Sequence, residues 1–271
     1  IHGIHGRAPG IATGLKAFRP DLHVWVVTGD GDALAIGGNH FIHAIRRNIG
    51  LKILMFNNRI YGLTKGQYSP TSELGKKTVS TPDGSIDRPF RPISLALGSE
   101  ATFVARVPDN AAKLMPEIFT AAHHHNGTAF VEIYQNCPVF NDGAFAAVTD
   151  KKVRDESMLL LRHGEPMLFG HDKTKGIIMR KARLAVATVG EDGVTEADIL
   201  VHDAHDPDPS IAFWLSRFDP PDFPVPVGVF RAVDHSTYEE SMKAQIEVAR
   251  ERQGPGNLEA LLTSGDTWVV Q

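Results

Sequence analysis

The sequence predicts an α/β fold built on a doubly wound, mostly parallel sheet with helices on both faces. Two observations carry this prediction: continuous apolar runs alternate with segments of helical period up to about residue 150, and the first runs end at polar turns. Parallel strands that are covered by helices on both faces read as such runs. With 271 residues, 42% of them hydrophobic, the chain is long enough to bury a core of this kind.

The expected elements follow in chain order. We expect helices at 9–17 and 38–48 and strands at 23–28 and 51–56. Residues 59–91 are rich in Gly, Pro, Ser and Thr and show no period, which is typical of a functional or disordered loop. After this loop we expect helices at 92–97 and 110–124 and strands at 102–105 and 128–134.

After Thr149 the alternation of apolar runs and helical segments stops. Short apolar pieces, separated by charged or Pro-rich turns, stand at 166–169, 185–189, 199–201 and 227–233. An amphipathic helix is expected over 236–252, with Ser236 and Glu239 at capping-box spacing and an ion pair between Glu239 and Lys243. A last short helix starts near Asn257. We expect this part to wrap on the first domain or on a partner.

Composition excludes several classes of function. The net charge of −4 provides no electrostatic footprint for nucleic acid. No apolar run approaches the ~18 residues of a membrane span, and no charged-then-apolar leader opens the chain. The single cysteine, Cys137, cannot form an internal disulfide. From these features we expect a cytoplasmic protein that binds neither nucleic acid nor membrane.

The most informative motif is Gly29-Asp30-Gly31, followed by 25 residues and then Asn57-Asn58. Asp30 and Asn58 follow two successive buried strands, so they lie at the edge where open α/β sheets bind ligands. A helix starting after Gly37-Gly38 offers its N-terminus to an anion. Carboxylate, amide and carbonyl oxygens are ligands that Mg²⁺ prefers, and its other positions go to diphosphate oxygens and water. The motif therefore predicts a site for a magnesium diphosphate.

Other interpretations of these residues stand beside this one. Asp30 and Asp32 after a strand are also compatible with a phosphotransferase in which Asp30 forms an aspartyl phosphate, but that alternative does not explain Asn57-Asn58. A Walker loop is excluded because Pro70 stands where it requires glycine. The histidines at 40 and 43, the run 123–125 and the polar turn 202–208 have metal-ligand residue types, but packed or solvated side chains are their ordinary role.

The motif and its surroundings resemble a known family. Gly-Asp-Gly, about 25 residues and Asn-Asn is the thiamine diphosphate signature. The segments HGRAPGIATGLK, WVVTGDGDALAIGGNHFIHAIRRN, FNNRIYGLTKGQYSPTS and VEIYQNCPVFNDGAF are similar to the β subunits of 2-oxoacid:ferredoxin oxidoreductases, specifically of the 2-oxoglutarate type. The resemblance covers nearly all of the chain. It implies a thiamine diphosphate-binding domain at 1–149 and a C-terminal extension at 150–271.

The resemblance also implies roles for individual residues. Mg²⁺ would be held by Asp30, Asn58 and the backbone carbonyl of Ile60. The cofactor would further contact the residues of the two motifs, namely Gly29, Gly31, Asp32, Tyr61, Gly62 and Leu63. His5 and Arg7 would lie near the cofactor and the substrate, and Lys65 would contact the substrate.

The reaction implied by the resemblance is oxidative decarboxylation. Thiamine diphosphate attacks the keto carbon, CO₂ leaves, electrons pass through a [4Fe-4S] cluster to ferredoxin, and coenzyme A takes the acyl group as succinyl-CoA. The organic chemistry belongs to the cofactor. The family's activating glutamate lies on the partner α subunit, so activity is expected only with that subunit.

The cysteines depart from the family pattern. These β subunits carry a Cys-x-x-Cys and a third cysteine before the HGR segment, and a fourth at the position of Cys137. Iron–sulfur clusters require thiolates, so we expect Cys137 to be a cluster ligand and an upstream segment to supply the others. The alternatives are a non-redox thiamine enzyme such as a decarboxylase or acetolactate synthase, a pyruvate-type oxidoreductase, and an assembly subunit with a vestigial site.

Overall fold

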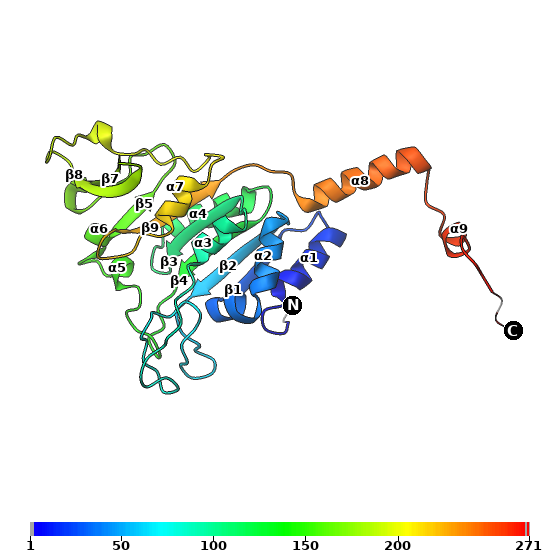
Figure 1. Ribbon diagram of the computed structural model, residues 1–271, viewed down its shortest axis with the longest axis horizontal. Coiled ribbons are helices and arrows are strands. Elements are labelled where there is room, and N and C mark those ends of the chain that lie inside the picture. Colours follow the sequence, from blue (N-terminus) through cyan, green and yellow to red (C-terminus); the bar gives the residue numbers. More distant parts are fainter. Residues whose placement is uncertain (1–2, 269, 271) are drawn as a thin grey trace.

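The computed structural model describes residues 3–268 and 270 (Figure 1). The strands are β1 (Val24–Gly29), β2 (Leu51–Asn57), β3 (Phe103–Pro108), β4 (Ala129–Tyr134), β5 (Met158–Leu161), β6 (Leu168–Phe169), β7 (Lys175–Arg180), β8 (Arg183–Thr188) and β9 (Val225–Ala232). The α-helices are α1 (Ala8–Phe18), α2 (Gly38–Arg46), α3 (Pro92–Gly98), α4 (Leu114–His124), α5 (Ala146–Thr149), α6 (Arg154–Ser157), α7 (Ser210–Leu215), α8 (Tyr238–Gln253) and α9 (Leu258–Leu262). The short helices are η1 (Asp32–Ile36), η2 (His171–Lys173) and η3 (Glu196–Asp198).

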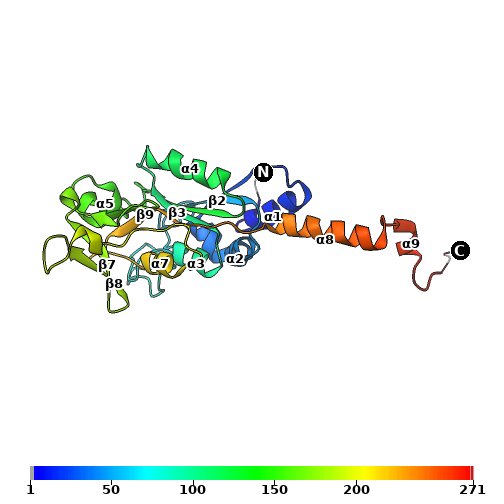
Figure 2. The same ribbon diagram turned by 90° about the horizontal axis from the view of Figure 1, so that it is seen from above.

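The main sheet confirms the α/β prediction. Its six strands follow the order β1-β2-β4-β3-β9-β5. The first four are parallel to their neighbours, β9 is antiparallel to β3, and β5 is parallel to β9. Helix α4 covers one face, and α2, α3 and α7 cover the other (Figure 2). The carboxyl ends of β1, β2, β3 and β4 therefore meet at one edge of the sheet.

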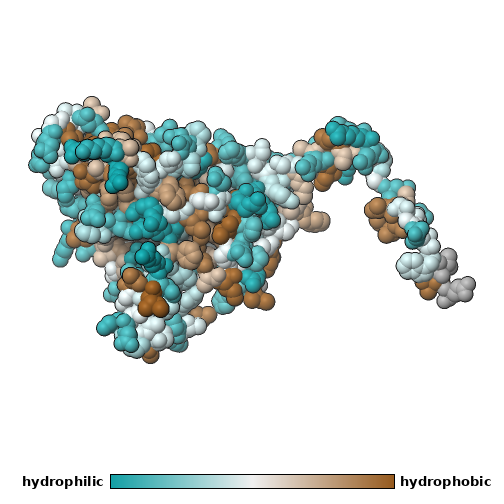
Figure 3. Space-filling view, in the orientation of Figure 1, coloured by the Kyte–Doolittle hydropathy of each residue, from teal (hydrophilic) through white to brown (hydrophobic). Residues whose placement is uncertain are grey.

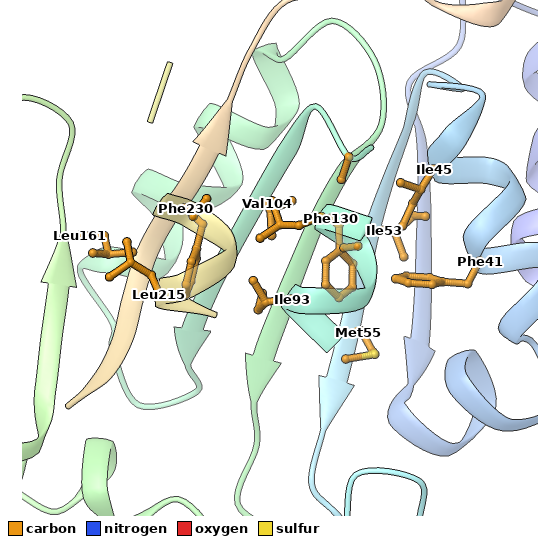
Figure 4. Close-up of a cluster of buried hydrophobic side chains, with 14 of the residues drawn as sticks. Phe41, Ile45, Ile53, Met55, Ile93, Val104, Phe130, Leu161, Leu215 and Phe230 are labelled. Atoms are coloured by element: carbon orange, nitrogen blue, oxygen red, sulfur yellow. The ribbon is translucent and has the colours of Figure 1, made fainter. Parts of the chain in front are cut away.

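The larger core lies between the sheet and the helices α1, α2, α3 and α7. Phe41 of α2 and Phe130 of β4 pack edge to face with ring centroids 5.0 Å apart, and Phe230 of β9 extends the cluster (Figure 4). A second core on the opposite face packs Ile118 and Ala122 of α4 against the strands. Each face of the central strands is thus buried, which is why they read as continuous apolar runs.

Most expected elements of the first half are confirmed within one or two residues, and the segment 58–91 is irregular. The helix expected over 110–124 begins only at Leu114, because Asn110 donates a side-chain hydrogen bond to the Thr149 carbonyl and the chain turns there. The piece 199–201 is not a strand. Ile199 is buried, and Val201 forms only an isolated bridge to Pro166.

The second half adds to the sheet of the first half. Strands β5 and β9 continue the main sheet beyond β3, while β6, β7 and β8 form a separate three-stranded antiparallel sheet. The proposed boundary at residue 149 thus separates strands of one sheet, and the division into two domains stays a prediction.

Helix α8 starts later than expected and projects from the body with α9 (Figure 1). Its capping box uses Thr237 and Glu240, so the proposed Ser236–Glu239 box is wrong by one residue. Glu239 is buried and accepts a hydrogen bond from the Gly50 N–H, and Lys243 lies 3.9 Å from Glu247 instead. Space filling shows hydrophobic patches along this projecting arm (Figure 3). Among the described residues, no helix is long and apolar enough to cross a membrane.

Candidate functional site

A pocket of about 740 Å³ lies at the carboxyl ends of β1 and β2. It brings together residues from the N-terminal segment, the Gly-Asp-Gly motif, the Asn-Asn motif and the loop after it. Of the sequence-predicted site residues, those that line it are His5, Gly29, Asp30, Gly31, Asp32, Asn58, Ile60, Tyr61, Gly62 and Leu63. The two motifs, far apart in sequence, therefore meet as the sheet-edge argument predicts.

The chain leaves β1 through a π-helical turn, η1, that runs into α2. A Cβ atom at Gly31 would lie 2.1 Å from Cε1 of Tyr61, so glycine lets the ring pack against the backbone. Helix α2 begins at Gly38 as expected, but η1 runs directly into it and neither Gly37 nor Gly38 lines the pocket, so the helix N-terminus is not placed at the pocket for an anion. Residues of the motif itself, Gly29 to Asp32, line the pocket.

Asp32 ties the N-terminal segment to the sheet. One carboxylate oxygen accepts hydrogen bonds from the Gly6 N–H at 2.6 Å and from His5 Nδ1 at 3.2 Å, and the other accepts one from the Thr28 hydroxyl at 2.5 Å. Gly6 has φ +73°, and a Cβ there would lie 2.6 Å from the Gly37 nitrogen. Asp32 thus lines the pocket while its carboxylate holds the His5-Gly6 turn in place.

Asp30 is the buried carboxylate of the pocket. It is 3% exposed, and its Oδ2 accepts hydrogen bonds from the hydroxyls of Ser69 and Thr71, each at 2.5 Å. Burial raises the pKa of Asp30, although the two hydroxyls oppose the shift. No lysine, arginine or histidine among the described residues forms a salt bridge with it. A buried carboxylate without a cationic partner fits a metal ligand.

Asn58 and Ile60 supply neutral oxygens beside this carboxylate. Asn58 Oδ1 accepts a hydrogen bond of 3.3 Å from the Ile60 N–H, and its amide nitrogen lies 3.4 Å from Gln135 Oε1. No described group donates a hydrogen bond to the Ile60 carbonyl. In the described part of the chain, no group of three or more His, Cys, Asp or Glu side chains is arranged to hold a metal ion. One carboxylate, one amide and one carbonyl are a donor set of the kind that Mg²⁺ accepts alongside diphosphate.

Residues 61–67, directly after Ile60, form a tight hairpin at the mouth of the pocket. Tyr61 and Gln67 pair as an isolated bridge, and the Gly66 N–H donates to the Tyr61 carbonyl at 2.8 Å. Gly62 and Leu63 line the pocket. Lys65 sits at the turn with φ +76°, is exposed, and does not line the pocket.

Arg7 and Cys137 also lie outside the lining. The Arg7 guanidinium donates to the Ile36 carbonyl at 3.0 Å. Cys137 is partly exposed in a loop that packs on the Asn58 turn, where the Asn141 amide donates to the Asn58 carbonyl at 3.0 Å. A four-iron cluster takes four thiolates, and this chain has one cysteine. The chain by itself does not fit a complete cluster.

Sequence reasoning missed Ser69 and Thr71, and it included Asn57 in the motif without assigning it a role. All three are at most 4% exposed and lie within the polar network behind Asp30. For the two hydroxyl residues, the only sequence signal of such a role was the dense run of hydroxyl side chains in the segment SPTS. The expected packed or solvated roles fit the other histidines: His123, for example, stacks on Trp25 with ring centroids 6.2 Å apart.

A second, smaller cavity of about 380 Å³ lies on the other side of Asn57. Its charged residues are paired with one another: Arg106 with Glu132 at 2.7 Å, and Arg59 with Glu73 at 3.0 Å. Burial raises the pKa of Tyr134 to about 12, so its phenol is neutral. None of the sequence-predicted site residues lines this cavity.

Comparisons with known proteins agree with this geometry. Residues 1–133 match the family described as thiamine pyrophosphate enzyme, C-terminal TPP binding domain. The chain is 52% identical to the 2-oxoglutarate oxidoreductase subunit KorB of Mycobacterium tuberculosis, over its whole length and 72% of that protein. It is 46% identical to the 2-oxoglutarate synthase subunit KorB of Archaeoglobus fulgidus, over 51% of the chain and 52% of that protein.

Among solved structures, the fold is similar to a 2-oxoglutarate:ferredoxin oxidoreductase from Magnetococcus marinus with 2-oxoglutarate, coenzyme A and succinyl-CoA bound. The TM-score is 0.70 at 30% identity, and the match covers 96% of this chain and 73% of that one. The chain thus spans about three quarters of the mycobacterial and Magnetococcus chains, and about half of the archaeal relative. On these findings, the chain belongs to the KorB family of 2-oxoacid:ferredoxin oxidoreductase β subunits, which are oxidoreductases with a thiamine pyrophosphate-binding domain.

Proposed function

We propose that this chain is the β subunit of a 2-oxoglutarate:ferredoxin oxidoreductase and that it binds Mg²⁺ and thiamine diphosphate in the pocket at the ends of β1 and β2. The single observation that carries the proposal is the convergence of buried Asp30 with Asn58 and Ile60 around one cavity. The relatives' names and the bound molecules of the Magnetococcus enzyme support the choice of substrate.

Each part of the chain would contribute to binding and positioning. Asp30, Asn58 and the Ile60 carbonyl would hold Mg²⁺, and the Mg²⁺ would hold the diphosphate. The hydroxyls of Ser69 and Thr71 fix the orientation of the Asp30 carboxylate. Thiamine diphosphate supplies the carbanion chemistry when it is bound.

The proposal includes a partner α subunit at the mouth of the pocket. Exposed apolar side chains surround the opening, among them Ile4 (79% exposed), Val27 (63%) and Leu63 (80%). Exposed apolar surface of this kind is typical of protein interfaces. A subunit docked there would exclude water from the cofactor and would complete the site.

Coenzyme A and ferredoxin are the proposed co-substrate and electron acceptor, as in the relatives' names and the Magnetococcus complex. Cys137 is the proposed single contribution of this chain to a [4Fe-4S] cluster. The other three thiolates would come from outside these 271 residues, because Cys137 is the only cysteine among them. The chain's position in the family favours this redox role over a decarboxylase, an acetolactate synthase, an aspartyl-phosphate enzyme or an inactive assembly subunit.

The proposed function is tested by turnover of the α/β complex with 2-oxoglutarate, coenzyme A, Mg²⁺, thiamine diphosphate and ferredoxin. We expect reduced ferredoxin and succinyl-CoA in proportion, and higher kcat/KM for 2-oxoglutarate than for pyruvate. In a full-length α/β complex that includes the other three proposed cluster thiolates, Cys137→Ser is expected to lower iron content and ferredoxin reduction while cofactor affinity is unchanged. CO₂ release without ferredoxin reduction by the wild-type complex would favour the non-redox alternative.

A further inference from the structure

A buried chain of hydrogen bonds leads from Asp30 across the carboxyl edge of the sheet to β3. The Thr71 hydroxyl lies 2.5 Å from Asp30 Oδ2 and 2.9 Å from Asn57 Oδ1. The Asn57 amide donates to Glu132 Oε1 at 2.7 Å, and Arg106 Nε donates to Glu132 Oε2 at 2.7 Å. All five side chains are at most 4% exposed. Polar groups this deeply buried act as a connected unit, since water cannot replace a lost partner.

The Asn57 amide has one permitted orientation in this network. Its nitrogen faces Glu132, and an ionised carboxylate can only accept hydrogen bonds. Its oxygen faces the Arg59 N–H at 3.2 Å and the Thr71 hydroxyl. Arg106 fixes the position of Glu132, because its guanidinium binds the same carboxylate at 2.7 Å with both side chains buried. The accepting carboxylate of Glu132 therefore decides which way the amide of Asn57 points.

The orientation of this amide bears directly on the proposed metal ligands. Asn57 precedes Asn58 in the chain, and the bond from the Arg59 N–H to Asn57 Oδ1 closes the turn that carries Asn58 and Ile60. The same amide oxygen, through the Thr71 hydroxyl, contacts Asp30. One side chain thus links all three proposed ligands, although it does not line the pocket that they face.

We propose that Glu132, held by Arg106, is a positioning residue for the Mg²⁺ site: it fixes the Asn57 amide and, through it, the geometry of Asp30, Asn58 and Ile60. The inference rests on the proposed function, and it concerns residues that touch neither metal nor cofactor. It predicts that the affinity for Mg²⁺ depends on Glu132 of β4 and Arg106 of β3, although the proposed ligands follow β1 and β2.

Glu132→Gln tests this directly. The glutamine oxygen has to accept the bond from Arg106, so its amide nitrogen faces the Asn57 nitrogen and two donors meet. Asn57→Asp disrupts the same contact in the opposite way, because it places two acceptors, the introduced carboxylate and that of Glu132, against each other. In the assembled α/β complex, we expect each variant to raise the Mg²⁺ concentration needed for half-maximal thiamine diphosphate binding by about 10- to 100-fold.

The double variant Asn57→Asp with Glu132→Gln supplies the rescue. The glutamine then accepts from Arg106 and donates to the aspartate, which accepts from the Arg59 N–H, so the contact between two donors and the contact between two carboxylates are both removed at unchanged net charge. We expect the Mg²⁺ dependence to return close to that of the wild type. Thr71→Val, which keeps the volume and removes the hydroxyl, is the milder second variant and is also expected to raise the Mg²⁺ concentration needed for half-maximal thiamine diphosphate binding.

The control is Thr102→Val, which removes a buried bond of 2.8 Å to Asn48 at the opposite edge of the sheet. It is expected to lower the melting temperature and leave the Mg²⁺ dependence unchanged. The positioning role is overturned if Glu132→Gln and Thr71→Val behave like this control, or if the double variant stays as weak as the single ones. A wild-type complex that binds no thiamine diphosphate would instead contradict the proposed function itself.

Discussion

Asp30 shows how a single residue reveals a site before any ligand is seen. An ionised carboxylate in a low-dielectric interior costs several kcal/mol unless it is paired, and the described residues offer Asp30 hydroxyl donors but no cationic partner. Its location and that of Asn58 could be predicted from the sequence, because both follow buried strands. Asn57, Ser69 and Thr71 could not be assigned, since their roles depend on contacts between segments 14 to 41 residues apart.

Gly31 carries the first prediction at the scale of a residue. A methyl group at this position would lie 2.1 Å from Tyr61 Cε1, so the ring has to move into the pocket or away from it. We expect Gly31→Ala to lower the free energy of unfolding by about 1–3 kcal/mol and to weaken thiamine diphosphate binding, measured by denaturant unfolding and by calorimetry.

The matched control for Gly31→Ala is Gly38→Ala. A Cβ at Gly38 meets no atom within 4 Å, and the residue begins α2 outside the pocket lining. This variant is expected to be neutral, or stabilised by up to about 1 kcal/mol. Equal cofactor affinity in both variants would show that the Tyr61 contact with Gly31 has no part in the site.

The elements were predictable wherever the local pattern decides them. Apolar runs located β1, β2 and β4, and helical period located α1, α2 and most of α4. Element ends were less certain. The α8 cap falls on Thr237 and Glu240 because Glu239 is used for another contact, with the Gly50 N–H. Such a competition between a cap and a tertiary contact is invisible in the sequence.

The hairpin at 61–67 carries the second prediction, at the scale of an element. Lys65 is exposed at the turn, four to seven residues after the proposed ligands Asn58, Ile60 and the pocket residue Tyr61. A second substrate carboxylate is costly to desolvate unpaired. Lys65 is exposed in this chain, so the charge pair forms only where the proposed α subunit covers the hairpin. In the α/β complex, we expect Lys65→Ala to lower kcat/KM for 2-oxoglutarate by about 30-fold or more, the consequence of losing roughly 2 kcal/mol from a desolvated charge pair.

Activity of Lys65→Ala on the neutral analogue 2-oxobutyrate should fall little. Lys77→Ala removes an exposed lysine of the same loop and serves as the control, with no loss expected on either substrate. If Lys65→Ala loses the same factor on both substrates, Lys65 supports the loop or the cofactor, and it does not select the substrate.

At the scale of the whole molecule, the arrangement of the second half was the least predictable part. β9 and β5 join the main sheet through pairings such as Phe103 with Ala232, more than 100 residues apart. Sequence periodicity carries no information on such long-range partners. The first half was predictable because its strands and helices alternate along the chain, each with its own local period, although β4 lies between β2 and β3 in the sheet.

At the scale of the whole molecule, the central property we propose is that the edge pocket binds thiamine diphosphate through Mg²⁺ held by Asp30. The most direct test is calorimetric titration of thiamine diphosphate into the α/β complex, with Mg²⁺ and with a chelator, for the wild type and for Asp30→Ala. We predict tight binding only for the wild type with Mg²⁺, because the variant lacks the charged ligand of the ion. Wild-type affinity in Asp30→Ala, or binding that is indifferent to Mg²⁺, would contradict the account.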